Sequence, residues 1–328
     1  MIRGIVVQRA NVAPAVCCPV QWSHLLQIAV NNGSLLTVLD PKLPTINTSI
    51  IQSSSAQPIL DLRALFHLNP EIHISDVIKN ERRPLLDVSI STFDQPILFG
   101  NFTDLQIVAH KWSFASPRTR NTYLAVLLNT SELFVLERDS AVPVYRVKYN
   151  VTEALIDNIR PNSSSSSDIS LTNDEYLGVK AISFDFASVD LDPALTISMA
   201  NGEVKIFMLK SGLPLIQLIL FDSVVTKLAW SPNCNMLLAC CANNQANLIE
   251  FNETDLENII EVQKPSRFLV SQLQWLDDDY FTVTNTTSLS IYSKAGLKIA
   301  SETLISNVMV TGISVNKLDL KHTFLIHI

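Results

Sequence analysis

Short apolar segments alternate with clusters of polar turn residues along most of the chain. Residues 225–251 read VTKLAWSPNCNMLLACCANNQANLIEF, in which three apolar segments are separated by SPNCN and by NNQ. Short runs of β-forming residues between clusters of Asn, Ser and Pro are typical of consecutive antiparallel strands. The pattern therefore predicts three strands in these 27 residues.

The same layout recurs four more times, and in each copy an aromatic residue lies at or near the end of the first strand. The copies cover residues 17–40, 107–137, 179–209, 225–251 and 270–293, and their aromatic residues are Trp22, Trp112, Phe184, Trp230 and Trp275. Trp230 follows Phe184 by 46 residues and precedes Trp275 by 45. Trp22 and Trp112 are 90 residues apart, so we expect one degenerate unit between them.

A repeat of about 40 to 45 residues with four short strands is typical of the blades of a β-propeller. We therefore predict an all-β fold: a divergent WD40-like β-propeller of six to seven four-stranded blades, in one domain over residues 1–328. The expected units lie near 17–60, 61–106, 107–150, 179–224, 225–269, 270–300 and 301–328. A strand at 1–8 is expected to complete the last blade and to cover two sheet edges.

Several features set the repeat apart from a regular WD unit. No unit has the Gly-His and Trp-Asp pairs of that repeat in the usual places, and the chain has only 8 glycines. Residues 151–178 are expected to form an inserted loop, because RPNSSSSSD at 160–168 is a polar tract that cannot pack. Within this insertion, residues 154–162 predict a short helix capped by Thr152.

We interpret the Trp-Ser-Pro sequence at 230–232 as architecture and not as chemistry. A large aromatic side chain can pack between blades, a serine can bond to nearby backbone, and a proline fixes φ at the start of a turn. The five aromatic residues of the repeats are therefore predicted to be structural blade anchors: Trp22, Trp112, Phe184, Trp230 and Trp275.

The composition favours a folded protein that contacts other proteins. The chain is 47% hydrophobic and has a formal net charge of -7, which argues against a surface built to bind phosphates. Mean hydropathy is +0.24, yet every apolar run is shorter than the ~18 residues of a spanning helix. We expect an intracellular protein with reduced cysteines, no secretory signal and no membrane contact.

The common signatures of nucleotide, metal and acyl-transfer sites are absent from the sequence. The six histidines are scattered, and the acidic run at 277–279 follows Trp275 where the other units place a turn. We therefore expect no enzyme, with no catalytic, cofactor-binding or metal residues, no cofactor and no small-molecule substrate. A propeller enzyme would need histidines and carboxylates at the ends of the inner strands, which read as Val, Leu, Ile and Ala.

Partners of propellers usually dock on rims and on inserted loops. On this basis the candidate interaction loops are the segment around 160–176 and the basic segment at 79–83. The corresponding candidate residues are Lys79, Arg82, Arg83, Asp168 and Asp174.

Two of the units resemble a known family. VQWSHLLQIAVNNGSLLTVLDPKLP at 20–44, and AHKWSFASPRTRNTYLAVLLNTSELFVLE at 109–137, are similar to the N-terminal propeller of the delta-type subunit of transcription factor IIIC. In that family a Trp-Ser strand leads to a segment that ends in Leu-x-Pro, which corresponds to Leu39 to Pro41 here. A later Trp-Ser-Pro unit precedes an apolar strand, which corresponds to Leu124 to Asn129 here. The third unit reads Ser-Phe-Ala-Ser-Pro where a plain Ser-Pro is usual.

The resemblance implies a nuclear scaffold of the RNA polymerase III initiation machinery. Such a subunit binds the other protein subunits of its complex, contacts DNA only indirectly, and connects promoter recognition to the TATA-binding-protein complex. Some members of the family have been credited with histone acetyltransferase activity, but no acetyl-CoA loop is found in this sequence. The chain ends in TFLIHI before any C-terminal domain of such a subunit, so we expect a fragment or an isolated domain.

Two alternatives remain open at this point. The first is another divergent WD40 scaffold, in ribosome assembly, trafficking or ubiquitin ligation, which would differ in its partners and not in its fold. The second is the propeller enzyme described above.

Overall fold

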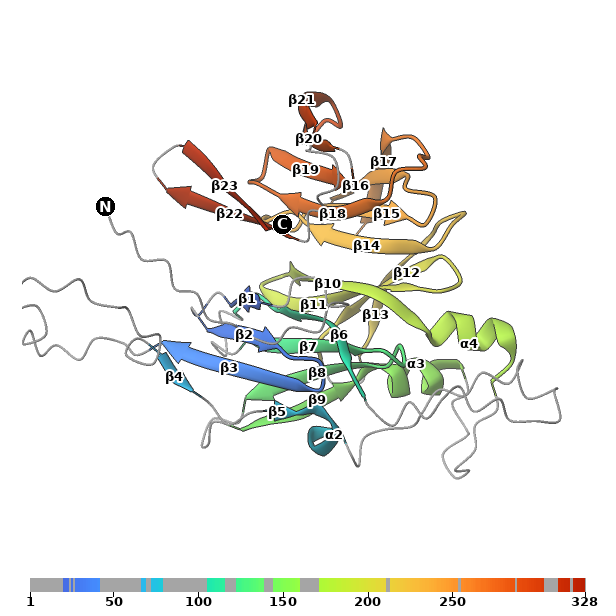
Figure 1. Ribbon diagram of the computed structural model, residues 1–328. Coiled ribbons are helices and arrows are strands. Elements are labelled where there is room, and N and C mark those ends of the chain that lie inside the picture. The colour runs from blue at the N-terminus through green and yellow to red at the C-terminus, as the bar shows by residue number, and fades with distance from the viewer. Residues whose placement is uncertain are drawn as a thin grey trace, which may run out of the picture.

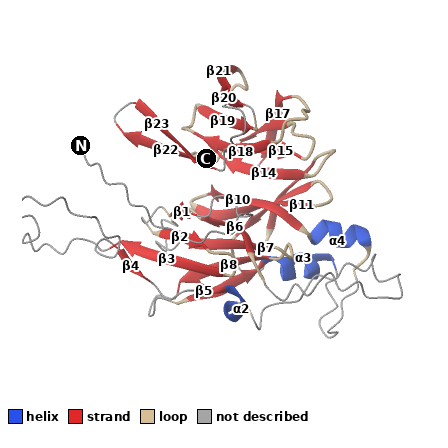
Figure 2. Cartoon of the chain, viewed as in Figure 1, coloured by secondary structure: helices blue, strands red, loops and turns tan. Residues whose placement is uncertain are grey.

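The structure of the protein is a computed structural model. Its described part consists almost entirely of antiparallel sheets (Figures 1 and 2). The structure describes residues 20–23, 25, 27–41, 66–68, 72–78, 105–115, 122–138, 144–159, 171–210, 213–252, 255–286, 288–303, 312–318 and 321–327. Six sheets follow one another along these residues, and we number them 1 to 6 in chain order.

Sheets 1 and 2 are formed by the N-terminal part of the described chain. Sheet 1 contains β1 (Val20–Trp22), β2 (Ile28–Asn31), β3 (Leu35–Pro41), β4 (Phe66–Leu68) and β5 (Ile72–His73). Sheet 2 contains β6 (Ile107–Trp112), β7 (Tyr123–Leu128), β8 (Leu133–Arg138) and β9 (Tyr145–Asn150).

Sheets 3, 4 and 5 each contain four strands that pair in sequence order. Sheet 3 is built from β10 (Ala181–Val189), β11 (Asp192–Met199), β12 (Glu203–Met208) and β13 (Leu215–Leu220). Sheet 4 is built from β14 (Val225–Trp230), β15 (Met236–Cys241), β16 (Ala246–Asn252) and β17 (Asp255–Gln263). Sheet 5 has β18 (Val270–Trp275), β19 (Tyr280–Asn285), β20 (Ser288–Ser293) and β21 (Lys298–Thr303). Sheet 6 is a hairpin of β22 (Gly312–Leu318) and β23 (Lys321–His327).

Burial falls from the second strand of a sheet to its fourth. Every residue of β7 and of β15 is buried, which explains why YLAVLL and MLLACC are apolar on both faces of the strand. By contrast, every residue of β21 is exposed. Strands covered on both faces read as continuous apolar runs, whereas an outer strand meets water.

The core consists of apolar layers between successive sheets. One cluster joins sheets 1 and 2, a second joins sheets 2 and 3, a third joins sheets 3 and 4, and a fourth joins sheets 4 and 5. A single four-stranded sheet cannot cover both of its faces, so each sheet depends on its neighbours for burial. The predicted all-β class and propeller architecture are confirmed, and Figure 1 shows the sheets placed in chain order from β1 to β21.

The residues between the first and third expected units are only partly described. Within 61–106, β4 and β5 both pair with β3, so these strands belong to sheet 1. The Asn31 side-chain amide donates to the Ile107 carbonyl at 2.9 Å, which joins sheet 1 directly to sheet 2. The number of blades stays a prediction, and the strand expected at 1–8 lies outside the described residues.

Three short helices accompany the sheets in the described part of the chain: α2 (Ile74–Val77), α3 (Val151–Ile159) and α4 (Asn173–Val179). The helix expected at 154–162 is present as α3, but the prediction of its cap was wrong. The Asn150 carboxamide oxygen, at the end of β9, accepts from the Glu153 backbone N–H at 3.1 Å. Thr152 is buried inside α3, and its hydroxyl accepts from the Leu133 N–H at 2.9 Å, so it ties the helix to β8.

The α4 helix starts with a reciprocal pair of bonds that the sequence analysis did not identify. The Thr172 hydroxyl accepts from the Glu175 N–H, and the Glu175 carboxylate accepts from the Thr172 N–H at 2.7 Å. This is a capping box, which satisfies two otherwise unpaired donors. The helices α3 and α4 lie next to each other (Figure 2), and no helix in the described ranges is long and apolar enough to cross a membrane.

Candidate functional site

The aromatic residues predicted as anchors differ in their burial. Trp112, Phe184 and Trp275 are 8%, 2% and 5% exposed, and Trp230 is partly buried. Phe184 lies inside β10, whereas the tryptophans end the first strands of their sheets. Trp22 is 58% exposed, and its role as an anchor stays a prediction.

Two of these tryptophans bond to the preceding sheet. The indole N–H of Trp230 donates to the Thr196 hydroxyl in sheet 3 at 2.8 Å. The indole N–H of Trp275 donates to the Ala229 carbonyl in sheet 4 at 3.0 Å. Both side chains therefore join one sheet to the sheet before it, and this gives the Trp230 and Trp275 positions a physical role between blades.

A polar residue one or two positions after the tryptophan organises the turn that follows the first strand. Three serine hydroxyls accept backbone N–H groups across these turns, as predicted: Ser23 from Gln27 at 3.0 Å, Ser113 from Tyr123 at 2.8 Å, and Ser231 from Met236 at 3.0 Å. In sheet 5 the Asp277 carboxylate does the same for two N–H groups, those of Asp279 and Tyr280, both at 2.8 Å. The acidic run at 277–279 is thus a turn, as the sequence indicates.

A charged pair on the first strands of sheets 2 and 3 was missed by the sequence analysis. The Lys111 ammonium lies 3.0 Å from one carboxylate oxygen of Asp185, and the other carboxylate oxygen accepts from the Trp230 N–H at 2.9 Å. The Lys111 ammonium also donates to the Leu228 carbonyl at 3.4 Å. Three successive sheets therefore meet at this pair.

The expectation from sequence concerned only the ends of the inner strands, whereas Lys111 and Asp185 lie inside β6 and β10. The available signal was a charged residue inside an otherwise apolar first strand, in HKW at 110–112 and in FDF at 184–186. A charge that is partly buried needs a partner, so each residue indicates that a partner exists without identifying it. The Lys111–Asp185 pair forms hydrogen bonds with backbone groups of sheet 4, so it connects sheets 2, 3 and 4.

His110 lies one position before Lys111 and is 1% exposed. Burial lowers the pKa of His110 to about 4, with a smaller opposing effect of the Ala29 backbone. The imidazole is therefore neutral at physiological pH. No group of three or more His, Cys, Asp or Glu residues suited to a metal ion occurs within the described ranges.

The cysteines of sheet 4 have the properties of packing residues. Cys240 and Cys241 lie in β15 and are both buried. Burial raises the pKa of Cys240 to about 12 and that of Cys234 to about 11. Both thiols are protonated at neutral pH, and a protonated thiol is a poor nucleophile.

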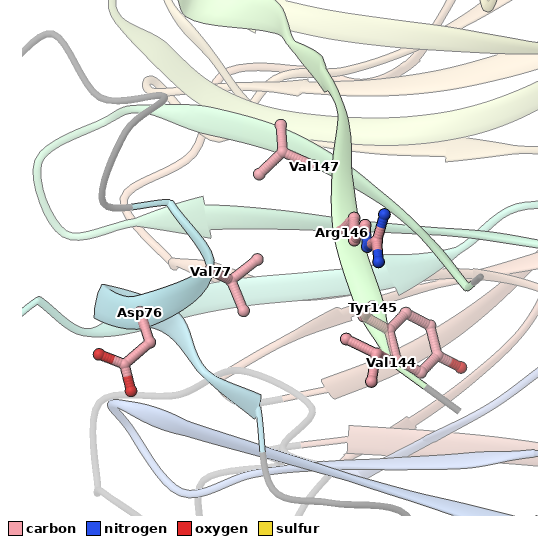
Figure 3. Close-up of a pocket in the computed structure, with 6 residues that line it drawn as sticks. All are labelled: Asp76, Val77, Val144, Tyr145, Arg146 and Val147. Atoms are coloured by element: carbon pink, nitrogen blue, oxygen red, sulfur yellow. The ribbon is translucent and has the colours of Figure 1, made fainter. Parts of the chain in front are cut away.

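A shallow depression of about 430 Å³ lies between α2 and the start of β9 (Figure 3). Its lining is half valine, with one acid, one base and one phenol: Asp76, Val77, Val144, Tyr145, Arg146 and Val147. Burial, the largest cause, raises the pKa of the Tyr145 hydroxyl far above its usual value. The lining brings together no pair of groups suited to acid–base or nucleophilic chemistry.

Only one of the residues proposed for interaction loops is described. Asp174 is exposed in the first turn of α4. Lys79, Arg82, Arg83 and Asp168 lie outside the described residues. The interaction role of these five residues stays a prediction.

The family of the chain is decided by a match that covers most of these sheets. The family model of the transcription factor IIIC subunit delta β-propeller domain matches residues 22–319. The chain belongs to this family. The N-terminal units alone resemble this transcription factor IIIC delta family, and the match extends from the last residue of β1 to the end of β22.

One solved structure supports the propeller fold of this transcription factor IIIC delta family member. The crystal structure of BBS1N in complex with ARL6DN is similar at a TM-score of 0.51 and 12% identity, over 97% of this chain and 76% of that one. A chain of the mitotic checkpoint complex has a TM-score of 0.48 and 12% identity, over 96% and 77%. No curated protein matches the sequence. At such low identity the similarity to BBS1N shows the fold and nothing about function.

Proposed function

We propose that this chain is a subunit of transcription factor IIIC and acts as a non-catalytic scaffold in the nucleus. Its task is to hold other subunits of the complex together during initiation of tRNA-gene transcription by RNA polymerase III. The observation that carries the proposal is the family match over residues 22–319.

The physical properties of the described sheets suit a scaffold. The sheets are joined by apolar layers and by side chains that form hydrogen bonds from one sheet to the next, so their arrangement is rigid. The outer strand β13 exposes three leucines, with exposed fractions of 49%, 44% and 71% for Leu215, Leu218 and Leu220. Exposed apolar side chains close together are typical of surfaces that contact other proteins.

Charge supports a protein partner over direct DNA binding. The formal net charge is -7, and binding to DNA depends on neutralising phosphates with clustered lysine and arginine. A subunit with this charge fits best where other subunits contact the DNA. We therefore propose that any effect on DNA binding is indirect.

The ionisable groups on the first strands of sheets 2 and 3 support a structural role. The Lys111–Asp185 pair is held by the backbone of sheet 4, and His110 is neutral and buried. The Lys111–Asp185 pair thereby stabilises the contact between sheets 2, 3 and 4. We propose no catalytic step for them.

The proposal is tested by purifying the tagged full-length protein from its own cells and identifying the co-purifying proteins by mass spectrometry. We expect the other subunits of transcription factor IIIC in near-equal amounts. Recovery of a different stable complex, without those subunits, would contradict the proposal. A tagged unrelated nuclear propeller, purified in parallel, controls for non-specific recovery.

A further inference from the structure

The loop between β17 and β18, residues 264–269, is exposed but firmly held; we call it the β17–β18 loop. Its sequence is KPSRFL. The Asn244 side chain holds the second half of the loop: its amide N–H donates to the Ser266 carbonyl at 2.9 Å, and its oxygen accepts from the Val270 N–H at 3.1 Å. Asn244 can do this because its backbone is left-handed, with φ 62°, a conformation that asparagine tolerates.

Further bonds tie the same loop to both neighbouring sheets. The Ser266 N–H donates to the Asn243 carbonyl in sheet 4 at 3.0 Å, and the Ser266 hydroxyl accepts from the Phe268 N–H at 3.1 Å. The Leu269 carbonyl accepts from the Thr286 N–H beside sheet 5 at 3.1 Å. The backbone of the loop is therefore fixed before any partner arrives, which lowers the entropic cost of binding.

The side chains of this fixed loop face solvent in an unusual combination. Phe268 and Leu269 are 41% and 53% exposed, and Lys264 and Arg267 are exposed beside them. The Arg267 guanidinium lies 5.4 Å from the centre of the Phe268 ring, so the cation and the aromatic ring form one surface. Arginine and aromatic residues are enriched among the residues that dominate binding energy at protein interfaces.

The charge of the β17–β18 loop is opposite to that of the whole chain. Its six residues contain two cations and no carboxylate, in a protein with 31 acidic and 24 basic residues. The carboxylate of Glu261, in β17, accepts from the Gln245 side-chain amide at 2.9 Å. That bond leaves the Glu261 charge in place, but within residues 264–269 the surface is cationic and apolar, and its complement is an anionic segment with an apolar side chain.

We propose that the β17–β18 loop binds a short acidic peptide segment of a partner protein that carries a bulky aliphatic residue. Arg267 and Lys264 contact its carboxylates, and Phe268 and Leu269 contact its aliphatic side chain. An arginine can bind a carboxylate through two parallel hydrogen bonds, which favours a carboxylate over a diffuse charge. The proposal rests on the scaffold function proposed above and identifies one surface that performs it.

The same observations favour a peptide over a nucleic acid. Two cations neutralise few phosphates, and the Phe268 ring already carries the Arg267 guanidinium at a distance where a base would stack. Leu269, with its exposed aliphatic side chain, offers a contact that suits a protein partner.

The test measures binding of a short fluorescent peptide of Glu, Leu and Ser to the full chain, by fluorescence anisotropy. Two matched peptides, one with Lys in place of Glu and one with Ser in place of Leu, test the charge and the apolar contact separately. A fluorescent single-stranded DNA oligonucleotide tests the nucleic-acid alternative. We expect the Glu-Leu peptide to bind best of the four probes.

The deciding variant combines Arg267→Glu with Leu269→Ser. Its control combines Lys298→Glu with Ile299→Ser on β21, because Ile299 is 59% exposed and the charge change is identical. We expect the loop variant to weaken peptide binding about tenfold or more, and the control to change it less than about twofold. Circular dichroism and the melting temperature of each variant confirm that both remain folded.

Equal weakening by both variants, or no peptide binding by the unaltered chain, would overturn the proposal. Tighter binding of the oligonucleotide, lost in the loop variant, would also overturn it in favour of a nucleic-acid surface. Failure of the scaffold function has a separate signature, since the unaltered chain would then not recover transcription factor IIIC subunits from cells. Recovery of those subunits without peptide binding would sink this inference alone.

Discussion

Replacement of Asp185 tests the contact between three sheets. In Asp185→Asn the charge facing Lys111 is lost, while the amide oxygen can still accept one backbone N–H. In Asp185→Ala the N–H groups of Trp230 and Phe186, at 2.9 Å each, also lose their acceptor. The two variants therefore separate the charge from the hydrogen bonds.

The expected magnitude follows from distance and exposure. A charge pair at the observed 3.0 Å has a Coulomb energy of about 5.5 kcal/mol at an effective dielectric constant of about 20. Desolvation and solvent offset most of this, since the Lys111 and Asp185 side chains are 33% and 17% exposed. We expect Asp185→Asn to lower the free energy of unfolding by about 1 to 2 kcal/mol, and Asp185→Ala by about 3 kcal/mol.

The assay is urea unfolding followed by tryptophan fluorescence, in a double-mutant cycle with Lys111→Met. We expect a coupling of about 1 kcal/mol between the two positions, because each single change removes the same interaction. The matched control is the Asp279 and Lys294 pair, whose side chains are 61% and 55% exposed and whose cycle should show no measurable coupling. Additive effects of Asp185→Asn and Lys111→Met would refute the reasoning.

Three further predictions concern buried and exposed rings. Trp230→Ala should lower the free energy of unfolding by about 3 kcal/mol and Trp230→Phe by about 1 kcal/mol. Both variants lose the hydrogen bond to Thr196, but Trp230→Phe keeps an aromatic ring. Equal costs in urea unfolding would contradict this. Trp22→Ala should leave the melting temperature almost unchanged, because Trp22 is 58% exposed; a large drop would show that the ring is covered. The free energy of unfolding should fall by about 2 kcal/mol between pH 7 and about pH 5. In this range His110 takes up a proton in the unfolded chain, whereas its pKa of about 4 in the folded protein keeps it neutral. His110→Gln should remove this loss, and an unchanged pH profile in that variant would contradict the assignment.

The repeat could be predicted from sequence because each strand carries its own signal. The apolar runs, the turn residues between them and the spacing from Phe184 to Trp275 depend on local chemistry alone. The serine after the tryptophan is equally local, since its hydroxyl bonds only two to ten residues away. These features are set within a single sheet.

Features that depend on contacts between sheets could not be predicted in the same way. Lys111 and Asp185 are 74 residues apart, and nothing in either segment states that the two strands are neighbours. Thr152 was taken as a cap because its hydroxyl suits one, yet that hydroxyl is used by Leu133 in β8. The β17–β18 loop becomes notable only when its bonds to Asn244 and Thr286 show that it is fixed.

The most direct test of the central claim is tRNA-gene transcription in a nuclear extract depleted of this protein. The account predicts that depletion abolishes transcription from a tRNA gene, that the purified complex restores it, and that an RNA polymerase II promoter in the same extract is unaffected. Undiminished tRNA-gene transcription after complete depletion would contradict the assignment to transcription factor IIIC.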